Sequence, residues 1–401
     1  FKWQTSMTVL YVLISTDPYS GSTKSFMILL KGVLKAGINV IVVSPDNNGI
    51  YPILCDMGVK VFIVPSKGNT WTGTRSLKDK LLFVPRQLGR LVVNFIAHRK
   101  MIAIFKDVTI DIIHSNSTVT DLGRHLATIR HIPHIYHIRE YGDKDFGLRY
   151  FPSNKSFHRY LNTTNVYTVC ITKDIQNHHG LHDNPNSKVI YNGIIEELSE
   201  GNINREGRDC FLYAGRIEQT KGLLELVKAY CRYASQFIEP LPLIVAGEVF
   251  DFKYKQEIDD FIDTNKLNKH IYFIGKCSDM QTLYRRAKAI VIPSKYEGFG
   301  RCMPEAMSNG CIVIGHNTGG TKEQFDNGLS LTGMEIGFRY DNKDKLVNAI
   351  INVHNADDSV LDPIRHSAFE VVCKLYSYDE YVNNVLSFYN LIKNNKTKIE
   401  R

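Results

Sequence analysis

Short apolar runs alternate with longer amphipathic segments along almost the whole chain. In the first half, the apolar runs that predict buried strands lie at 9–14, 40–43, 59–64, 110–114, 134–137 and 166–171. A second series lies at 211–214, 243–246, 271–274, 289–292, 311–314 and 337–340. Segments of helical period separate them, for example 223–233 and 280–287. Strands that alternate with helices in this way predict parallel sheets covered by helices.

A polar, glycine-containing stretch at 197–208 separates the two series and predicts a linker. A chain of 401 residues is also too long for one ordinary core. We therefore predict an α/β fold with two Rossmann-like, doubly wound domains, at 7–197 and 208–376. They are expected to face each other across a cleft, with ligands at the carboxyl ends of the strands. The apolar stripe of 378–396 predicts a helix that crosses back onto the first domain; the stripe consists of Tyr381, Val385, Leu386, Tyr389 and Ile392.

Composition narrows the class of protein. Hydrophobic residues make up 43% and charged residues 22%, and no run approaches the roughly 20 apolar residues that span a bilayer. The eight cysteines are scattered singly, which favours reduced thiols and a cytoplasmic location. The net charge of +8 suits anionic small molecules or a membrane surface. Zinc spacings, aromatic RNA-binding signatures and dense basic tracts are missing, so we expect no nucleic-acid partner.

The segment 297–305 follows a predicted strand and leads into a predicted helix at about 303–309. Gly298 and Gly300 flank Phe299, so backbone N–H groups can approach a ligand closely there. The helix start suits a phosphate or sugar hydroxyls, and Glu305 in its first turn can accept from both hydroxyls of a ribose. The alternative is that Glu305 complements the helix dipole and Glu297 is a solvated loop acid.

A second cluster of candidate residues follows the strand at 211–214. Gly215 ends the strand, and Arg216 and Lys221 lead into the next predicted helix. Two cations beside a helix start fit a diphosphate that gains charge as its bond to a sugar breaks. Surface charges at a helix start are the alternative.

The order of these motifs resembles glycosyltransferase family 4, whose members are retaining enzymes of the GT-B architecture. The resemblance covers almost the whole chain and depends on segments 214–216, 221–222, 245–248, 191–194, 297–305 and 318–321. It implies that Arg216 and Lys221 hold the donor diphosphate and that Glu305 binds ribose. Glu297 and the backbone of Gly298, Phe299 and Gly300 would contact the donor sugar. Gly215, Gly247 and Asn192 would also bind the donor, and Gly21, within a Ser-Gly-Ser loop, stands where the family often has two glycines.

On the acceptor side this chain departs from the family. Many members carry a His-Asp-like pair at the end of a first-domain strand, where Arg139 and Glu140 stand here. We include both among the catalytic candidates and expect His137 to point elsewhere, as a core histidine. Asp143-Lys144-Asp145 and the histidines 178, 179 and 182 invite a metal site, but both lie in polar loops, and we expect no metal and no cofactor.

The segment 77–105 mixes large apolar residues with Lys78, Lys80, Arg86, Arg90, Arg99 and Lys100. One interpretation is a basic amphipathic helix that lies on an anionic membrane. The other is a helix that packs one face against the core and exposes the opposite face to solvent.

The hypothesis from sequence is a metal-independent hexosyltransferase that moves a sugar from a UDP- or GDP-sugar to a saccharide or lipid-linked acceptor. Surface polysaccharide or glycolipid assembly, in the cytoplasm or at the inner face of the membrane, is the expected setting. The alternatives are a nucleotide-sugar epimerase or a phosphorylase on the same architecture, and a non-catalytic sugar-nucleotide or polysaccharide binder.

Overall fold

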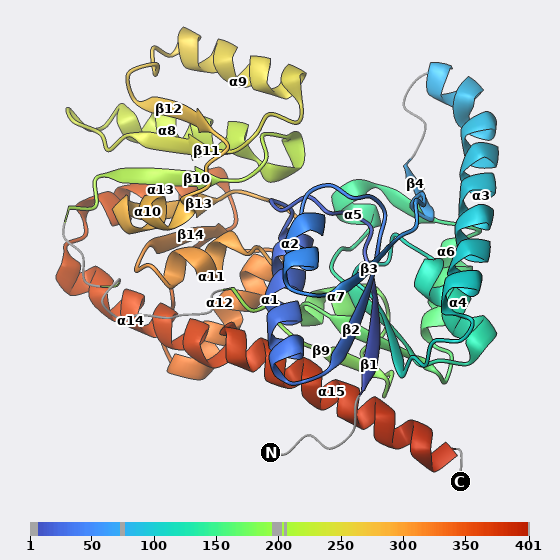
Figure 1. Cartoon of the computed structure of the whole chain (residues 1–401). Helices are drawn as coiled ribbons and strands as arrows, with labels where there is room; N and C mark the ends of the chain where they lie inside the picture. The colour runs from blue at the N-terminus through green and yellow to red at the C-terminus, as the bar shows by residue number, and fades with distance from the viewer. Residues whose placement is uncertain (1–6, 73–76, 195–202, 204–206, 400–401) are drawn as a thin grey trace. The chain divides into compact units, whose positions relative to one another are not determined.

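The computed structural model describes residues 7–72, 77–194, 203 and 207–399, with side chains omitted at 77–80 and 396–399. Most of the predicted linker at 197–208 lies outside the described residues. The chain divides into two compact units (Figure 1). The first combines Phe1–Gly193 with Tyr378–Arg401, and the second is Ile194–Ser377.

The first unit contains a parallel sheet with the strand order β3-β2-β1-β5-β6-β8-β9. Its strands are β1 (Thr8–Val12), β2 (Asn39–Ser44), β3 (Lys60–Ile63), β5 (Ile112–Ser115), β6 (His134–Ile138), β8 (Val166–Cys170) and β9 (Ser187–Val189). A separate antiparallel pair joins β4 (Thr70–Thr72) to β7 (Leu148–Tyr150). The apolar runs predicted six of these strands, whereas the three-residue strands β4, β7 and β9 were not predicted.

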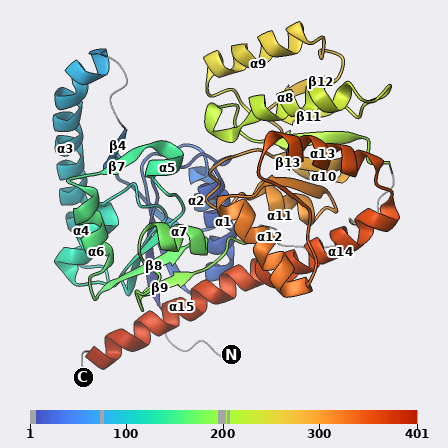
Figure 2. The same cartoon turned by 180° about the vertical axis from the view of Figure 1, so that it is seen from behind.

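Helices cover both faces of this sheet (Figures 1 and 2). They are α1 (Gly21–Lys35), α2 (Tyr51–Asp56), α3 (Leu77–Phe105), α4 (Leu122–Arg130), α5 (Asp143–Phe146), α6 (Asn154–Leu161), α7 (Lys173–His178) and α15 (Tyr378–Ile399). Helices α1, α2 and α15 share one core with the sheet, and α3 and α4 share the core on the other face. All five residues of the predicted stripe on α15 are buried in the first of these cores.

The second unit contains a parallel sheet with the strand order β12-β11-β10-β13-β14-β15. Its strands are β10 (Cys210–Ala214), β11 (Leu243–Ala246), β12 (Ile271–Gly275), β13 (Ala287–Ile292), β14 (Ile312–His316) and β15 (Phe338–Tyr340). Each of them overlaps a predicted run. The short 3-10 turn η2 (Gln219–Lys221) follows β10, and the helices are α8 (Leu223–Ala234), α9 (Phe252–Thr264), α10 (Met280–Arg286), α11 (Cys302–Met307), α12 (Gly319–Thr332), α13 (Lys343–Asn355) and α14 (Asp358–Leu375).

Both sheets have a point at which the direction of winding reverses. In the second unit the chain runs outward from β10 through β11 to β12 and then returns to β13, which pairs with β10. In the first unit it runs from β1 through β2 to β3 and returns to β5, which pairs with β1. The loops after the two central strands diverge there, and ligands of doubly wound sheets bind in that crevice. The predicted fold class, α/β with two Rossmann-like domains, is confirmed.

Candidate functional site

Two loops of the second unit meet at its switch point, and each carries a predicted site residue. Lys221 ends η2 after β10, and Glu297 lies in the loop after β13. The Lys221 Nζ atom donates a hydrogen bond of 2.7 Å to Glu297 Oε1. Gly222 has a φ of +71°, and a Cβ at this position would lie 2.5 Å from the carbonyl oxygen of Pro293. A glycine is therefore needed for the lysine loop to pack against the end of β13.

The Lys221–Glu297 pair is charged and largely shielded from water. The two side chains are 21% and 14% exposed. Burial lowers the pKa of Lys221, but the charge and hydrogen bond of the Glu297 carboxylate raise it by more, so that the pKa of Lys221 is raised overall. Burial likewise raises the pKa of Glu297, and the Lys221 ammonium outweighs it, so that the net pKa of Glu297 is lowered. Each partner thus holds the other in its ionised form.

Arg216, the second predicted cation, belongs to the same loop as Lys221. Its Nη2 atom lies 2.9 Å from Glu218 Oε1, and its guanidinium lies 5.2 Å from the centre of the Phe250 ring. Arg216 is close enough to act electrostatically on both Lys221 and Glu297. The sequence did not predict Glu218, which orients one of the two cations from two residues further along the chain.

Glu305 lies in the first turn of α11, as predicted, although that helix spans Cys302–Met307 instead of 303–309. Arg301 Nη2 lies 3.1 Å from Glu305 Oε1, and the Tyr284 hydroxyl donates a hydrogen bond of 3.2 Å to Glu305 Oε2. Both oxygens are therefore oriented by the protein, and each retains a second lone pair for a ligand donor. Arg301 and Tyr284 were not predicted as site residues, and only Arg301, at i,i+4 spacing, carried a signal in the sequence.

The loop of Gly298, Phe299 and Gly300 is fixed against the start of α12. The Gly320 N–H donates a hydrogen bond of 2.7 Å to the Glu297 carbonyl, and a Cβ on Gly320 would lie 2.6 Å from the Gly298 carbonyl oxygen. The Phe299 side chain is buried and packs edge-on against Tyr376. The Phe299 side chain is thus taken up by this packing, and the contact of its backbone with a donor sugar stays a prediction.

Gly215 and Gly247 lie back to back where β10 and β11 end. The Gly215 N–H donates to the Ala246 carbonyl, and a Cβ on Gly247 would lie only 1.8 Å from the Gly215 carbonyl oxygen. This close approach accounts for glycine at position 247 by packing alone, and its donor contact stays a prediction.

In the first unit, Arg139 forms a hydrogen-bonded centre beyond the end of β6. Its guanidinium donates to the Asn116 carbonyl (3.1 Å), to Asn116 Oδ1 (2.9 Å) and to Asn192 Oδ1 (2.7 Å). Asn116 in turn donates to the Ser22 carbonyl, at the start of α1 beside Gly21. The structure thus joins the predicted residues Arg139 and Asn192 directly, and Asn116 connects Arg139 to Ser22, next to Gly21.

One expectation about this region is wrong. His137 does not point away from Arg139: its Nδ1 atom lies 3.3 Å from Arg139 Nη2 and 3.2 Å from His114 Nε2. Residues two apart in a strand share a face of the sheet, so alternation places His137 and Arg139 together. The His114 Nδ1 atom is hydrogen-bonded to the Tyr389 hydroxyl of α15, and His137, His114 and Tyr389 are all buried.

Glu140 is buried, and its carboxylate anchors the loop after β5. Oε1 accepts hydrogen bonds from the Ser117 hydroxyl (3.0 Å), the Thr118 N–H (3.1 Å) and the Thr118 hydroxyl (2.5 Å). Burial raises the pKa of Glu140, and these three donors partly oppose that shift. The contacts assign Glu140 a structural role in this loop, and its proposed catalytic role stays a prediction.

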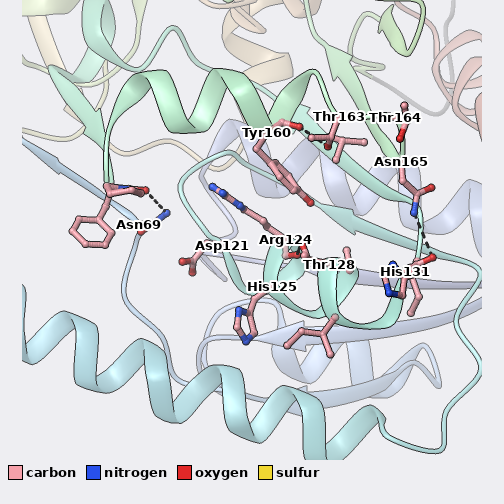
Figure 3. A pocket seen from close by; sticks show the side chains of 16 residues that line it. Asn69, Asp121, Arg124, His125, Thr128, His131, Tyr160, Thr163, Thr164 and Asn165 are labelled. Atoms are coloured by element: carbon pink, nitrogen blue, oxygen red, sulfur yellow. Dashed lines mark hydrogen bonds between the residues drawn. The ribbon is translucent and has the colours of Figure 1, made fainter.

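The other polar clusters of the first unit have local partners. Asp145 accepts from the N–H groups of Tyr141 and Gly142, and Asp143 pairs with His178 at 2.8 Å. A separate cavity of about 670 Å³ lies between α4 and α6 (Figure 3), where the Arg124 guanidinium stacks on the Tyr160 ring. None of the predicted site residues lines this cavity.

Comparison with known proteins links the unit that carries Lys221 and Glu297 to the glycosyl transferases. Residues 194–365, all within the second unit, match the family model of the glycosyl transferases group 1. The matched range contains Arg216, Lys221, Glu297 and Glu305. The two doubly wound sheets have the GT-B fold, and this match is in keeping with that fold.

Three particular proteins are similar to this chain. An uncharacterized glycosyltransferase of Methanocaldococcus jannaschii is 28% identical over 61% of this chain and 66% of its own length. The poly(glycerol-phosphate) alpha-glucosyltransferase of Bacillus subtilis is 30% identical over 42% of this chain and 24% of its own length. The chain thus spans less than two thirds of either curated relative. The crystal structure of Anabaena HepE in complex with UDP superposes with a TM-score of 0.73 at 17% identity, over 95% of this chain and 99% of HepE.

Proposed function

We propose that this chain is a retaining, metal-independent hexosyltransferase that moves a sugar from a nucleoside diphosphate donor to a hydroxyl acceptor. The observation that carries the proposal is the contact of Lys221 with Glu297 at the switch point of the unit that matches the group 1 model. The UDP bound to HepE supports a uridine nucleotide as the first donor to test.

The proposed donor site assigns a task to each charged group. Arg216 and Lys221 bind the diphosphate, with Glu218 and Glu297 holding the two cations in position. Glu305, oriented by Arg301 and Tyr284, accepts the ribose hydroxyls. The backbone of the loop from Gly298 to Gly300 contacts the sugar.

The proposed chemistry is a front-face displacement. The bond from the anomeric carbon to the diphosphate oxygen breaks, the acceptor oxygen bonds to the same face, and the acceptor proton passes to the departing diphosphate. Arg216 and Lys221 stabilise the negative charge that the diphosphate gains, which is an interaction stronger in the transition state than in the ground state.

The acceptor side is assigned to the first unit. Arg139, fixed by Asn116 and Asn192, provides donors for an acceptor hydroxyl near the end of β6. We propose a saccharide or lipid-linked acceptor in surface polysaccharide or glycolipid assembly, in the cytoplasm or at the inner face of a membrane. The eight cysteines are free thiols, which supports a reducing compartment.

The test begins with thermal-shift titrations of the full chain with UDP, GDP and their hexose derivatives. The derivative that stabilises most is then incubated with and without saccharide acceptors, and release of the diphosphate is measured. We expect Lys221→Ala to lower kcat about 100-fold or more with a smaller change in KM, because the lysine acts on the leaving group. Retention is checked by NMR of the product anomer, and addition of EDTA should leave the rate unchanged.

Lys374→Ala is the matched control, since Lys374 forms an exposed ion pair with Glu370 on α14. Equal loss of kcat and of donor affinity in Lys221→Ala would reduce Lys221 to a binding residue. Formation of an epimerised sugar nucleotide in the absence of any acceptor would show that the chain is an epimerase and not a transferase.

A further inference from the structure

Helix α3 exposes large apolar side chains on the side that faces water. Leu81, Val84, Leu88, Val92, Phe95 and Ile96 are all exposed, from 59% at Leu88 to 77% at Leu81. We call these six residues the outer face of α3. Monomeric soluble proteins rarely expose a continuous apolar surface of this extent, which normally marks an interaction site.

The outer face is distinct from the face by which α3 joins the core. Ala97, Met101 and Phe105 are buried in the core with α4 and the sheet, and Asn94 is buried beside them. At 3.6 residues per turn these four positions lie on the opposite side of the helix from the six exposed ones. The core therefore accounts for one side of α3 and leaves the outer face uncovered within the first unit. Figures 1 and 2 both show the N-terminal half of α3 extending beyond the body of this unit.

From Leu81 onward, the charges on α3 have a single sign. From Leu81 to Phe105 the sequence contains Arg86, Arg90, Arg99 and Lys100 and no acidic residue. Arg86, Arg99 and Lys100 are exposed, and Lys100 donates to the Ile63 carbonyl along the edge of the helix. Arg90 instead donates to the Thr70 carbonyl on the inner side.

We propose that the outer face of α3 binds the surface of a lipid bilayer that contains anionic headgroups. Apolar side chains flanked by cations match the boundary between acyl chains and negative headgroups. A second copy of the chain matches less well, since a two-fold contact would bring the cations of both helices together without an acid on either face. Among the described residues, no helix has the length and hydropathy to cross a bilayer, so the contact runs along the surface. The proposal is independent of the transferase activity.

The experiment is flotation of the full chain with vesicles of phosphatidylcholine alone and vesicles that contain about 30% phosphatidylglycerol. We expect binding to the anionic vesicles, weaker binding to the neutral ones, and at least a tenfold loss of bound protein in Leu88→Glu/Phe95→Glu. The control is Ile238→Glu/Phe252→Glu in the second unit, where both side chains are also exposed. This control should bind as the unaltered chain does.

A second variant, Arg86→Gln/Arg99→Gln, keeps the apolar face and should lose binding to the anionic vesicles only. Unchanged thermal unfolding of both variants, expected for exposed side chains, excludes misfolding as the cause of the loss. Three results overturn the proposal: no binding of the unaltered chain to anionic vesicles, equal loss in the control, or a dimer in light scattering that Leu88→Glu/Phe95→Glu dissociates.

Discussion

A lysine and a glutamate that are shielded from water stabilise each other only while both are present. Removal of one partner of the Lys221–Glu297 pair leaves a shielded charge without its counterion. We expect Lys221→Met and Glu297→Gln each to lower the free energy of unfolding by about 1–3 kcal/mol, and the double variant to recover part of the loss. Urea unfolding of the four proteins measures the coupling.

The exposed pair Lys374–Glu370 provides the comparison cycle, with an expected coupling of at most about 0.5 kcal/mol. If the losses at Lys221 and Glu297 simply add, the pair contributes no mutual stabilisation and the picture of a charged, shielded contact is wrong.

At the residue scale, the sequence supplied candidate site residues but not the contacts between them. Lys221 and Glu297 stood out because cations and acids followed apolar runs at strand ends. Tyr284 had no such signal, since it reaches Glu305 only through the packing of α10 beside α11. Glu140 had the right position for an acceptor-side acid, but its burial under Ser117 and Thr118 depends on a loop that no local pattern describes.

At the scale of elements, the contact of α1 with α15 depends on a missing side chain. A Cβ on Gly32 would lie 2.4 Å from Cγ2 of Val382, whose branched side chain has little freedom to move. We expect Gly32→Ala to destabilise the first unit by about 1–3 kcal/mol through overpacking. Val382→Ala in the same chain should restore most of that loss, as measured by chemical denaturation.

Gly89→Ala is the control, because a Cβ at this helical position meets no atom within 4 Å. It should be neutral or slightly stabilising. Failure of Val382→Ala to rescue Gly32→Ala would mean that the glycine is required for another reason.

Elements were predictable wherever burial alone determined the pattern. The central strands of both sheets are buried on both faces and appear as continuous apolar runs. The strands β4, β7 and β9 have three residues each and mix polar with apolar positions, so their pairing depends on distant partners. Helix α3 showed the limit of periodicity: the sequence left open whether its apolar residues face the core or a membrane, and only the structure distinguishes its buried side from its exposed one.

At the scale of the whole molecule, the buried histidines are unevenly distributed. Burial lowers the pKa of His134 to about 3 and that of His179 to about 4, and it lowers the pKa of His114 and of His137 well below 6.5. All four belong to the first unit. As the pH falls, these histidines take up protons in the unfolded chain at a higher pH than in the folded one. The stability that they contribute is therefore present above pH 6.5 and is lost as the pH falls below it.

We therefore expect the first unit to open before the second as the pH falls from 6.5 to 4.5. Each buried histidine removes up to about 1.4 kcal/mol per pH unit in this window. Glu140 and Asp145, whose pKa values burial raises, act in the opposite direction but are two groups against four. Hydrogen exchange followed by mass spectrometry at pH 7 and pH 5, corrected for intrinsic rates, measures the two units separately. Faster opening of the second unit would contradict this account.

Because α15 completes the core of the first unit, the order of synthesis and the order of folding differ. Residues 1–193 leave the ribosome first, yet Tyr381, Val385 and Tyr389 must still be added before their core closes. The second unit is continuous in sequence and has all of its strands as soon as residue 377 has emerged. Domains fold as their last segment becomes available, so the nascent chain finishes its C-terminal unit before its N-terminal one. Until then, the apolar surface that α15 will cover on α1 is open to chaperones.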